Sequence, residues 1–289
     1  MEFSVEALPG VRSFKEADWS KFAGAARGLN EYNPFISHAF LSALELSACV
    51  GGRTGWQPRI LKISDASGAI RAAVPAYLKS HSQGEYVFDH GWADAFQRAG
   101  GQYYPKLQVT VPFTPATGPR LLAAKGDSDA MHAAATAIQE TTLQSTLSSA
   151  HLTFLPETEA NLLGEHGYLR RTDQQFHFFN RDYRDYSDFL DSLASRKRKA
   201  LRKEREAALA NGITIHRLTG AELTETVWDQ FFAFYLDTGG RKWGRPYLTR
   251  EFFSRVGETM ADEILLVMAM RNGRYIAGAI NFIGGERIY

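Results

Sequence analysis

A repeated order of predicted helices and strands constrains the fold of this chain more than any other feature of its sequence. Two helices followed by a strand hairpin are predicted near residues 14–78 and again near residues 221–283. The helices are indicated by apolar residues at helical spacing, and the second hairpin by the turn residues Asn272 and Gly273. The order of elements repeats, although the residues do not, so we expect two related α/β domains in tandem, with mixed sheets flanked by helices. The expected segments are helices at 14–29, 37–49, 221–237 and 249–260, and strands at 58–64, 70–78, 264–270 and 275–283.

The first domain is expected to span residues 1–179 and the second residues 180–289. The first contains a long insertion, residues 79–119, that is rich in Gly, Pro and aromatic residues and is expected to hold short strands at 86–89 and 107–111. An irregular segment of this length in a compact domain is usually functional. A new strand begins after Gly285 and stops at Tyr289, so we expect the second domain to be truncated. Further predicted elements are helices at 128–149, 157–166 and 187–211, the last as one helix or two adjoining ones, and strands at 151–155 and 213–218.

Charge and cysteine content exclude several classes of function. The 289 residues contain 33 Lys and Arg against 32 Asp and Glu, so the net charge of +1 attracts neither nucleic acid nor anionic lipid to the chain as a whole. The single cysteine, Cys49, excludes an internal disulfide framework and a multi-thiolate zinc site. No run of 18 apolar residues and no signal peptide is present, so no membrane span is predicted. We expect a cytoplasmic protein, or one that associates peripherally with the inner face of the membrane.

The first candidate site lies at residues 80–92, where His81, Glu85, Asp89 and His90 are close in sequence. If residues 86–89 form a strand, Glu85 and Asp89 lie at its opposite ends. We predict that they act as general base and orienter for an attacking amine, with His81 as a further catalytic candidate. The alternative is a polar loop whose histidines are hydrogen-bonded and inert. The segment lacks the helical His pair or thiolate typical of zinc sites, so no metal is predicted.

The second candidate site lies at residues 102–120, where a strand runs into a Gly/Pro loop before the helix at 128–149. Backbone N–H groups and the helix dipole favour anions at such a place, and Lys106 and Arg120 add cations. No Lys-Ser or Lys-Thr pair follows Gly118, so this is not the phosphate loop of nucleotide-binding proteins. The alternative is a rigid, Pro-rich connection.

The third candidate is a basic helix at residues 196–206, which contains seven bases and two acids. Its local charge is +5, so the other residues sum to −4. Arg198, Arg202 and Arg205 share one face at helical spacing. Such a stripe is suited to a diphosphate, RNA or anionic headgroups. The alternative is a solvated helix surface.

A fourth candidate is the loop at residues 237–247. It combines Arg241, Lys242 and Arg245 with the aromatic residues Trp243 and Tyr247. Such a loop is suited to a substrate gate or to packing between two domains.

With these residues assembled, the chain resembles the FemAB-like branch of the GNAT (acyl-CoA N-acyltransferase) superfamily, in which N-acyltransferase folds occur in tandem. More narrowly, it resembles a bacterial group named for peptidoglycan biosynthesis or recognition. The narrow resemblance is carried by residues 33–35, 77–82, 84–89, 103–107 and 112–122. The broader resemblance is carried by Gly118 and Pro119 before the third helix, Gly167 and Tyr168, Gln174 and Gln175, a basic helix start similar to Lys-x-Arg-x-x-Ile-Arg at residues 196–202, and Arg241.

The resemblance implies an amide-forming acyltransferase. Arg196, Arg198 and Arg202 become candidates to hold the phosphates of a nucleotide- or lipid-linked muropeptide. We add Arg241, Lys106, Tyr104 and Trp92 as substrate-binding residues, and Thr117, Gly118 and Arg120 as residues that contact the donor. The donor is acyl-CoA, as in ordinary GNAT enzymes, or aminoacyl-tRNA, as in bridge-forming relatives, and no tightly bound cofactor is expected. The acyl-CoA loop Gln/Arg-x-x-Gly-x-Gly/Ala is missing, which leaves the donor open.

Three functions follow from these observations. The first is acyl or aminoacyl transfer to an amine of a peptidoglycan precursor or similar anionic acceptor. The second is a non-catalytic module that recognises peptidoglycan precursors or anionic polymers through the basic helix. The third is RNA binding through residues 196–205, which predicts a steep loss of affinity with salt.

Overall fold

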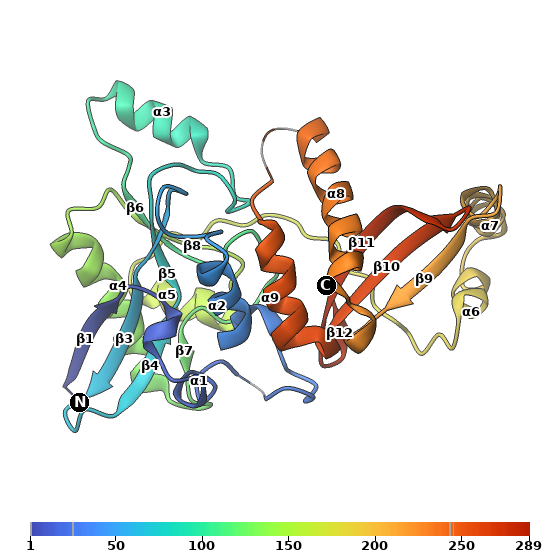
Figure 1. The fold of residues 1–289 in the computed structure, drawn as a ribbon. Coiled ribbons are helices and arrows are strands. Elements are labelled where there is room, and N and C mark those ends of the chain that lie inside the picture. The colour runs from blue at the N-terminus through green and yellow to red at the C-terminus, as the bar shows by residue number, and fades with distance from the viewer. Residues whose placement is uncertain (1, 25, 243, 245) are drawn as a thin grey trace.

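The structure, a computed structural model, describes residues 2–24, 26–242, 244 and 246–289. Figure 1 shows an N-terminal half built on two connected sheets beside a C-terminal half built on a third. Helices pack against the sheets in both halves, so the predicted α/β fold class is confirmed.

The first sheet is antiparallel throughout and has the strand order β1-β3-β4-β7. Helix α4 (Ser128–Gln144) covers one face of this sheet, because its alanines allow close approach to Leu61 and Ile63 of β3. The side chain of Asp127 begins the helix by accepting a hydrogen bond from the Ala130 N–H at 3.2 Å. The strands are β1 (Phe3–Leu8), β3 (Ile60–Asp65), β4 (Ile70–Val74) and β7 (Leu122–Ala123).

The second sheet has the order β2-β5-β6-β8 and is mixed, because β6 and β8 run parallel. Only Pro75 separates β5 from β4, so the two sheets are continuous at this point. Lys79 and Lys106 lie opposite each other where β5 pairs with β6. The strands are β2 (Trp56–Pro58), β5 (Ala76–Lys79), β6 (Lys106–Val109) and β8 (Ala150–Leu152).

The third sheet repeats the topology of the first. In the N-terminal half, β1 is followed by α1 (Glu16–Trp19) and α2 (His38–Leu46) and then by the antiparallel pair β3 and β4. In the C-terminal half, β9 (Thr214–Leu218) is followed by α8 (Glu225–Lys242) and α9 (Arg250–Met260) and then by the antiparallel pair β10 (Ile264–Arg271) and β11 (Arg274–Gly284). Strand β12 (Arg287–Ile288) pairs with β11 at the edge. The predicted repeat of two helices and a hairpin is therefore confirmed.

One hydrophobic core joins the two halves. Helix α2 packs against α9, and the Phe40 ring lies 5.6 Å from the ring of Phe252 and 5.5 Å from that of Phe282, in edge-on contact with both. Phe35 contacts the ring of Tyr289 at 5.1 Å. Because these rings are buried in a shared cluster, separating the halves exposes apolar surface from both.

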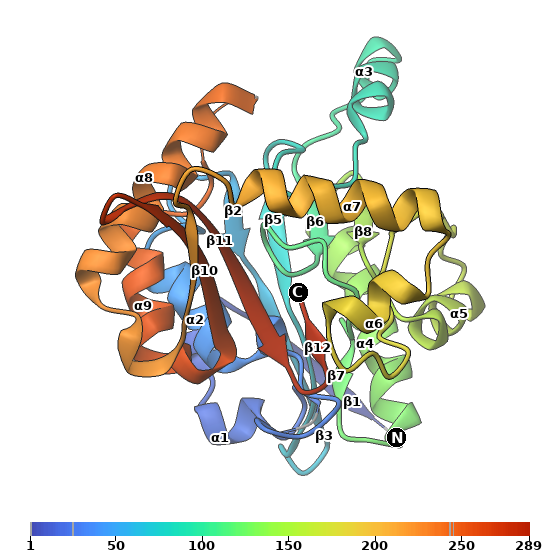
Figure 2. The same cartoon turned by 90° about the vertical axis from the view of Figure 1, so that its right-hand side faces the viewer.

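Four further helices lie at the periphery: α3 (His90–Arg98), α5 (Glu157–Glu165), α6 (Tyr186–Asp191) and α7 (Ser195–Ala208). Figures 1 and 2 show α3 projecting from the N-terminal half, and α6 and α7 together at the outer end of the C-terminal half. None of the residues of α7 is buried. No helix within the described ranges is long and apolar enough to cross a membrane.

The structure corrects several local predictions. Residues 86–89 do not form a strand, because the chain turns at Gly84 (φ +86°) and Tyr86 (φ +56°) and then enters α3, which was not predicted. The helix expected at 14–29 is limited to α1, and strand β1 was missed. The helix expected at 187–211 is divided into α6 and α7, the second of the two predicted forms.

Candidate functional site

Four charged side chains meet in the interior beside β5 and β6. We call Lys79, Glu85, Asp89 and Lys106 the buried charge cluster; each is at most 3% exposed. Two lysines directly opposite on neighbouring strands repel each other, and burial adds the cost of removing both charges from water. The two carboxylates balance this charge, which explains why the loop before α3 is drawn over the ends of the strands.

Asp89 and Lys106 form the shortest ion pair in the cluster. The Lys106 Nζ lies 2.6 Å from Asp89 Oδ2 and donates a second hydrogen bond to Ser82 Oγ at 2.9 Å. The Tyr103 hydroxyl also donates to Asp89 Oδ2, at 2.6 Å. Burial raises the pKa of Asp89, but these hydrogen bonds outweigh burial and lower its pKa to about 2. Asp89 is therefore ionised at neutral pH and is a weak base.

Glu85 lies between the two lysines without hydrogen-bond geometry to either. Its oxygens are 3.3 Å from Lys106 Nζ and 3.8 Å from Lys79 Nζ, and neither oxygen accepts a hydrogen bond from a described residue. A carboxylate held by charge alone has free lone pairs, which distinguishes Glu85 from Asp89.

Lys79 is the most perturbed base of the cluster. Burial lowers its pKa to about 7, although the nearby Glu85 carboxylate opposes this shift. Its Nζ lies 3.5 Å from the centre of the Trp56 ring and donates to the Gln83 carbonyl at 2.9 Å. The ring and the carbonyl stabilise the protonated form, while the dry surroundings favour the neutral amine.

His81 and Tyr104, two residues predicted from the sequence, lie against this cluster. His81 Nδ1 is 3.4 Å from Lys79 Nζ, and its Nε2 is 2.9 Å from the Thr54 carbonyl oxygen. The Tyr104 hydroxyl donates to Ser82 Oγ at 2.8 Å. Glu85, Asp89 and His81 were predicted in one segment and Tyr104 and Lys106 in another, and the structure brings the two groups together.

Aromatic rings from both halves lie over the loop that carries Glu85. Phe113 packs on Gly84, where a Cβ atom would collide with the ring, and Phe113 stacks on Tyr247 at 4.9 Å with the planes 10° apart. Tyr247 therefore packs between the two halves, one of the two roles predicted for residues 237–247. Trp243 and Arg245 of the same prediction lie outside the described residues.

Arg120 holds the Gly/Pro loop together from inside. Its guanidinium donates to the carbonyls of Ala116, Gly118 and Pro119, and burial lowers its pKa to about 10. The side chain is 0% exposed, so in this conformation it offers no surface to a donor. This position differs from the predicted donor contact, because the carbonyls of a tight loop need a buried donor of their own.

The other two residues predicted to contact the donor are Thr117, which is half-buried, and Gly118, which is buried. The Thr117 hydroxyl donates to Gln175 Oε1 at 3.2 Å, and Gln175 in turn donates to the Pro115 carbonyl at 2.6 Å. Gly118 packs so closely on Asn33 that a Cβ atom would collide with the amide. The loop is therefore fixed by its neighbours on both sides.

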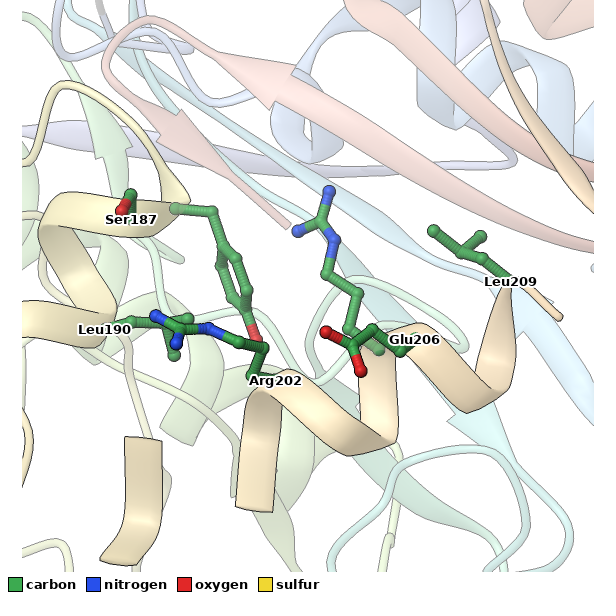
Figure 3. A pocket seen from close by; sticks show the side chains of 7 residues that line it. Ser187, Leu190, Arg202, Glu206 and Leu209 are labelled. Carbon is green, nitrogen blue, oxygen red and sulfur yellow. The ribbon is translucent and has the colours of Figure 1, made fainter. Parts of the chain in front are cut away.

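The basic helix is the second cluster of predicted residues. Arg198 pairs with Asp191 of α6, its Nη1 3.0 Å from Oδ1. Arg202 and Arg205 line a pocket of about 290 Å³ between α6 and α7. Figure 3 shows Arg202 and Glu206 of α7 across this pocket from Ser187 and Leu190 of α6, with Leu209 at one end. The Arg205 guanidinium lies 4.4 Å from the centre of the Tyr186 ring.

The side chains of Trp92 and Arg241 make their contacts elsewhere. Trp92 lies in the first turn of α3, and its N–H donates to the Asp89 carbonyl at 3.0 Å, but its side chain is exposed and stacks with the Arg171 guanidinium at 5.2 Å. Arg241 lies near the end of α8 and pairs with Asp237, with 2.5 Å between Nη2 and Oδ2. Among the described contacts, neither of these predicted substrate-binding side chains touches a charged group of the buried charge cluster.

Four residues of these sites were not predicted as site residues: Lys79 of the cluster, Tyr103 and His151 beside it, and Tyr186 of the pocket. His151 Nε2 lies 3.4 Å from the Tyr103 hydroxyl, and burial lowers the pKa of His151 to about 4. The sequence did contain a signal for Lys79, because this lysine ends a strand whose other residues are apolar. No group of three or more His, Cys, Asp or Glu side chains suited to a metal occurs in the part of the chain that the structure describes.

A family model, FemAB-like, described by peptidoglycan biosynthesis or recognition, matches residues 10–289. No curated protein matches significantly.

Two solved structures align with low similarity. One is a tandem GNAT protein from the clavulanic acid biosynthesis pathway, with a TM-score of 0.45 and 10% identity over 98% of this chain and 75% of the other. The other is L-PGS from Bacillus licheniformis, with a TM-score of 0.42 and 13% identity over 91% of this chain and 66% of the other. The family model covers nearly the whole sequence and agrees with the resemblance inferred from its motifs, so the chain belongs to the FemAB-like family of peptidoglycan biosynthesis or recognition.

Proposed function

We propose that this protein transfers an acyl or aminoacyl group to an amine of an anionic peptidoglycan precursor. The observation that carries the proposal is the uncompensated positive charge of α7. Among the described residues, no acid forms an ion pair with six of its cations, whereas Arg198 has Asp191. The six are Arg196, Lys197, Lys199, Arg202, Lys203 and Arg205.

The pocket between α6 and α7 supplies a place for the anionic part of the acceptor. Arg202 and Arg205 against Glu206 give its lining a formal charge of +1. Guanidinium groups bind phosphate through paired, charge-assisted hydrogen bonds, so a nucleotide- or lipid-linked precursor fits this lining. A lipid-linked acceptor would bring the protein to the inner face of the membrane.

The buried charge cluster supplies the groups for proton transfer. In the reaction, the acceptor nitrogen attacks the donor carbonyl carbon, an amide C–N bond forms, and the donor's thioester or ester bond breaks. Glu85 takes the amine proton, because its oxygens accept no hydrogen bond from described residues, and the proton then leaves with the thiol or hydroxyl leaving group. Asp89, whose pKa is about 2, orients Lys106 and Tyr103. The acceptor reaches Glu85, which is 3% exposed, only when the covering loop moves.

The donor is acyl-CoA or an aminoacyl-tRNA. Either carries phosphates, so the basic helix suits both, and the resemblance of residues 196–202 to bridge-forming enzymes supports the tRNA. A mass-spectrometric screen with each donor and a nucleotide-linked muropeptide tests the proposal. We expect a product heavier by one acyl or aminoacyl group, and no product with any donor contradicts transfer.

Variants of α7 test the role of the pocket. Arg202→Ala should raise the KM for the acceptor about tenfold, because a charge-assisted hydrogen bond contributes about 1.5 kcal/mol. Lys203→Ala is the matched control, since it removes the same charge from the next position without touching the pocket. Equal effects of the two substitutions contradict a specific contact.

A non-catalytic recognition module is the second candidate function. The observation that favours it is the burial of the cluster, whose two lysines and two carboxylates neutralise one another. Saturable binding of the muropeptide without turnover of either donor supports this alternative.

A further inference from the structure

A second pocket lies beside the C-terminal end of α2, and neither the proposed reaction nor the basic helix uses it. It has a volume of about 680 Å³ and lies between the C-terminal end of α2, the start of β2 and the turn at Val11–Ser13. Its lining includes two arginines, Arg12 and Arg53, and the apolar side chains of Pro9, Val50 and Pro58. The size falls within the range of small-molecule sites, which combine apolar walls with a few polar groups.

Both arginines are exposed to solvent. Within the described residues, neither Arg12 nor Arg53 forms an ion pair within 4 Å. Glu45, the acid of this pocket, accepts a hydrogen bond from the Val11 N–H at 2.6 Å and attracts the Arg12 side chain electrostatically, so Arg53 is the cation of the lining with the least competition from an acid. The lining has a formal charge of +1, which complements a single carboxylate.

The loop between α2 and β2 adds backbone donors. Gly51 (φ +86°) and Gly52 (φ +55°) are both left-handed, a conformation that glycine adopts without strain. The Gly51 N–H donates to the Trp56 carbonyl and the Thr54 N–H to the Gly51 carbonyl, at 2.7 and 3.1 Å. Within the described residues, the N–H groups of Gly52 and Arg53 have no acceptor.

The loop is also held rigid from behind. The Thr54 hydroxyl donates to the Gly51 carbonyl at 2.8 Å and accepts from the Trp56 N–H at 3.2 Å. His81 packs on Gly55 so closely that a Cβ atom there would collide with its ring. A loop fixed in this way loses little entropy when it binds a ligand.

We infer that this pocket binds a small organic molecule through an oxyanion, most simply a carboxylate, held by Arg12, Arg53 and the N–H groups of Gly52 and Arg53. The apolar walls take the organic part of the ligand. A phosphate monoester offers the same oxyanion chemistry with more charge. The experiment must therefore distinguish a carboxylate ligand from a phosphate ligand.

Backbone amide NMR of the full chain labelled with ¹⁵N-glycine and ¹⁵N-arginine tests the inference. Succinate and inorganic phosphate are titrated in parallel at constant ionic strength. We expect saturable shifts of the Gly52 and Arg53 amides, stronger for succinate, with affinity about tenfold weaker in Arg53→Ala and in Arg12→Ala. Arg59→Ala is the matched control, because Arg59 is an exposed arginine of the next segment that does not line the pocket.

Each result decides one part of the inference. Tighter binding of phosphate than of succinate overturns the carboxylate and retains the oxyanion site. The site is overturned if the Gly52 and Arg53 amide signals do not shift at the highest concentrations of succinate and phosphate. It is also overturned if Arg59→Ala weakens binding as much as Arg53→Ala and Arg12→Ala do. The measurement needs no acyl transfer, so failure of the proposed reaction does not affect it.

Discussion

Replacing Asp89 with Asn should destabilise the fold by an amount that the buried charge cluster determines. The substitution keeps the shape of the side chain and removes its charge, so the cluster changes from neutral to a formal charge of +1. The pKa of Asp89 falls from 3.8 to about 2 on folding, because the hydrogen bonds from Lys106, Ser82 and Tyr103 outweigh the effect of burial. At about 1.4 kcal/mol per unit, ionised Asp89 contributes about 2 kcal/mol.

Breaking a buried ion pair on one side costs about 3–5 kcal/mol in other proteins. Glu85 still lies 3.3 Å from Lys106 in the variant, which reduces this cost. We therefore expect Asp89→Asn to lower the free energy of unfolding by about 2–3 kcal/mol at pH 7. Urea denaturation followed by circular dichroism measures it, and Asp94→Asn is the control, because Asp94 is an exposed residue of the same helix and its loss should cost less than about 0.5 kcal/mol.

The pH dependence identifies charge as the cause. A carboxyl group with a depressed folded pKa stabilises the protein above its unfolded pKa, and this contribution is lost as the pH falls through the folded value. The difference in the free energy of unfolding between wild type and Asp89→Asn should therefore narrow below pH 4, where Asp89 loses its charge.

A double-mutant cycle with Lys106→Met completes the test. Removal of both partners leaves Lys79 and Glu85, which are neutral together, so the double variant should be more stable than additivity predicts by about 2 kcal/mol. The reasoning would be refuted if the effects of Asp89→Asn and Lys106→Met on the free energy of unfolding were additive and the effect of Asp89→Asn did not change with pH.

Three further predictions concern stability. Burial lowers the pKa of Lys79 from 10.5 to about 7, so between these pH values the unfolded chain binds a proton that the folded chain does not. The stability of wild type should therefore rise relative to that of Lys79→Met when the pH is raised from 7 to 9.5, as measured by the urea midpoints of both proteins. Phe40→Ala should lower the free energy of unfolding by about 3–5 kcal/mol, because the ring packs on Phe252 and Phe282 of the other half. Fluorescence and circular dichroism should report one unfolding transition for wild type, and two separate transitions would contradict a shared core. Gly278→Ala should cost about 1–3 kcal/mol by calorimetry, since its Cβ would collide with Met268 and Phe231, whereas Gly91→Ala meets no atom and should be nearly neutral.

Apolar spacing and turn residues predicted three of the four repeated helices and both hairpins, because these elements each bury one apolar face, whereas only α1 forms within the helix expected at 14–29. It failed at residues 86–89, where two left-handed residues and the attraction of Asp89 to Lys106 decide the path of the chain. Helix α3 had a usable signal in Trp92 and Phe96, which are one helical turn apart. Strand β1 had one in the alternation of apolar and polar residues from Phe3 to Leu8.

Site prediction found both carboxylates and Lys106, and missed Lys79. Glu85 and Asp89 were identified as acids within a chemically rich segment, which sequence shows directly. Lys79 became significant only through the strand register that places it opposite Lys106, and register depends on contacts far apart in sequence. For the same reason Arg120 was assigned to a ligand, although the loop it closes surrounds it completely.

Glu85 and Asp89 can be separated as catalytic and positioning residues by their contacts. Glu85→Gln removes the free carboxylate and leaves the Asp89–Lys106 pair at 2.6 Å, so the fold should persist while kcat falls at least about a hundredfold with little change in KM. Asp89→Asn retains Glu85, and where circular dichroism shows both variants folded, it should retain more activity than Glu85→Gln. Full transfer activity in the Glu85→Gln, Asp89→Asn double variant would contradict a base in this cluster, and its four charges would then serve only to hold the loop before α3 against the sheet.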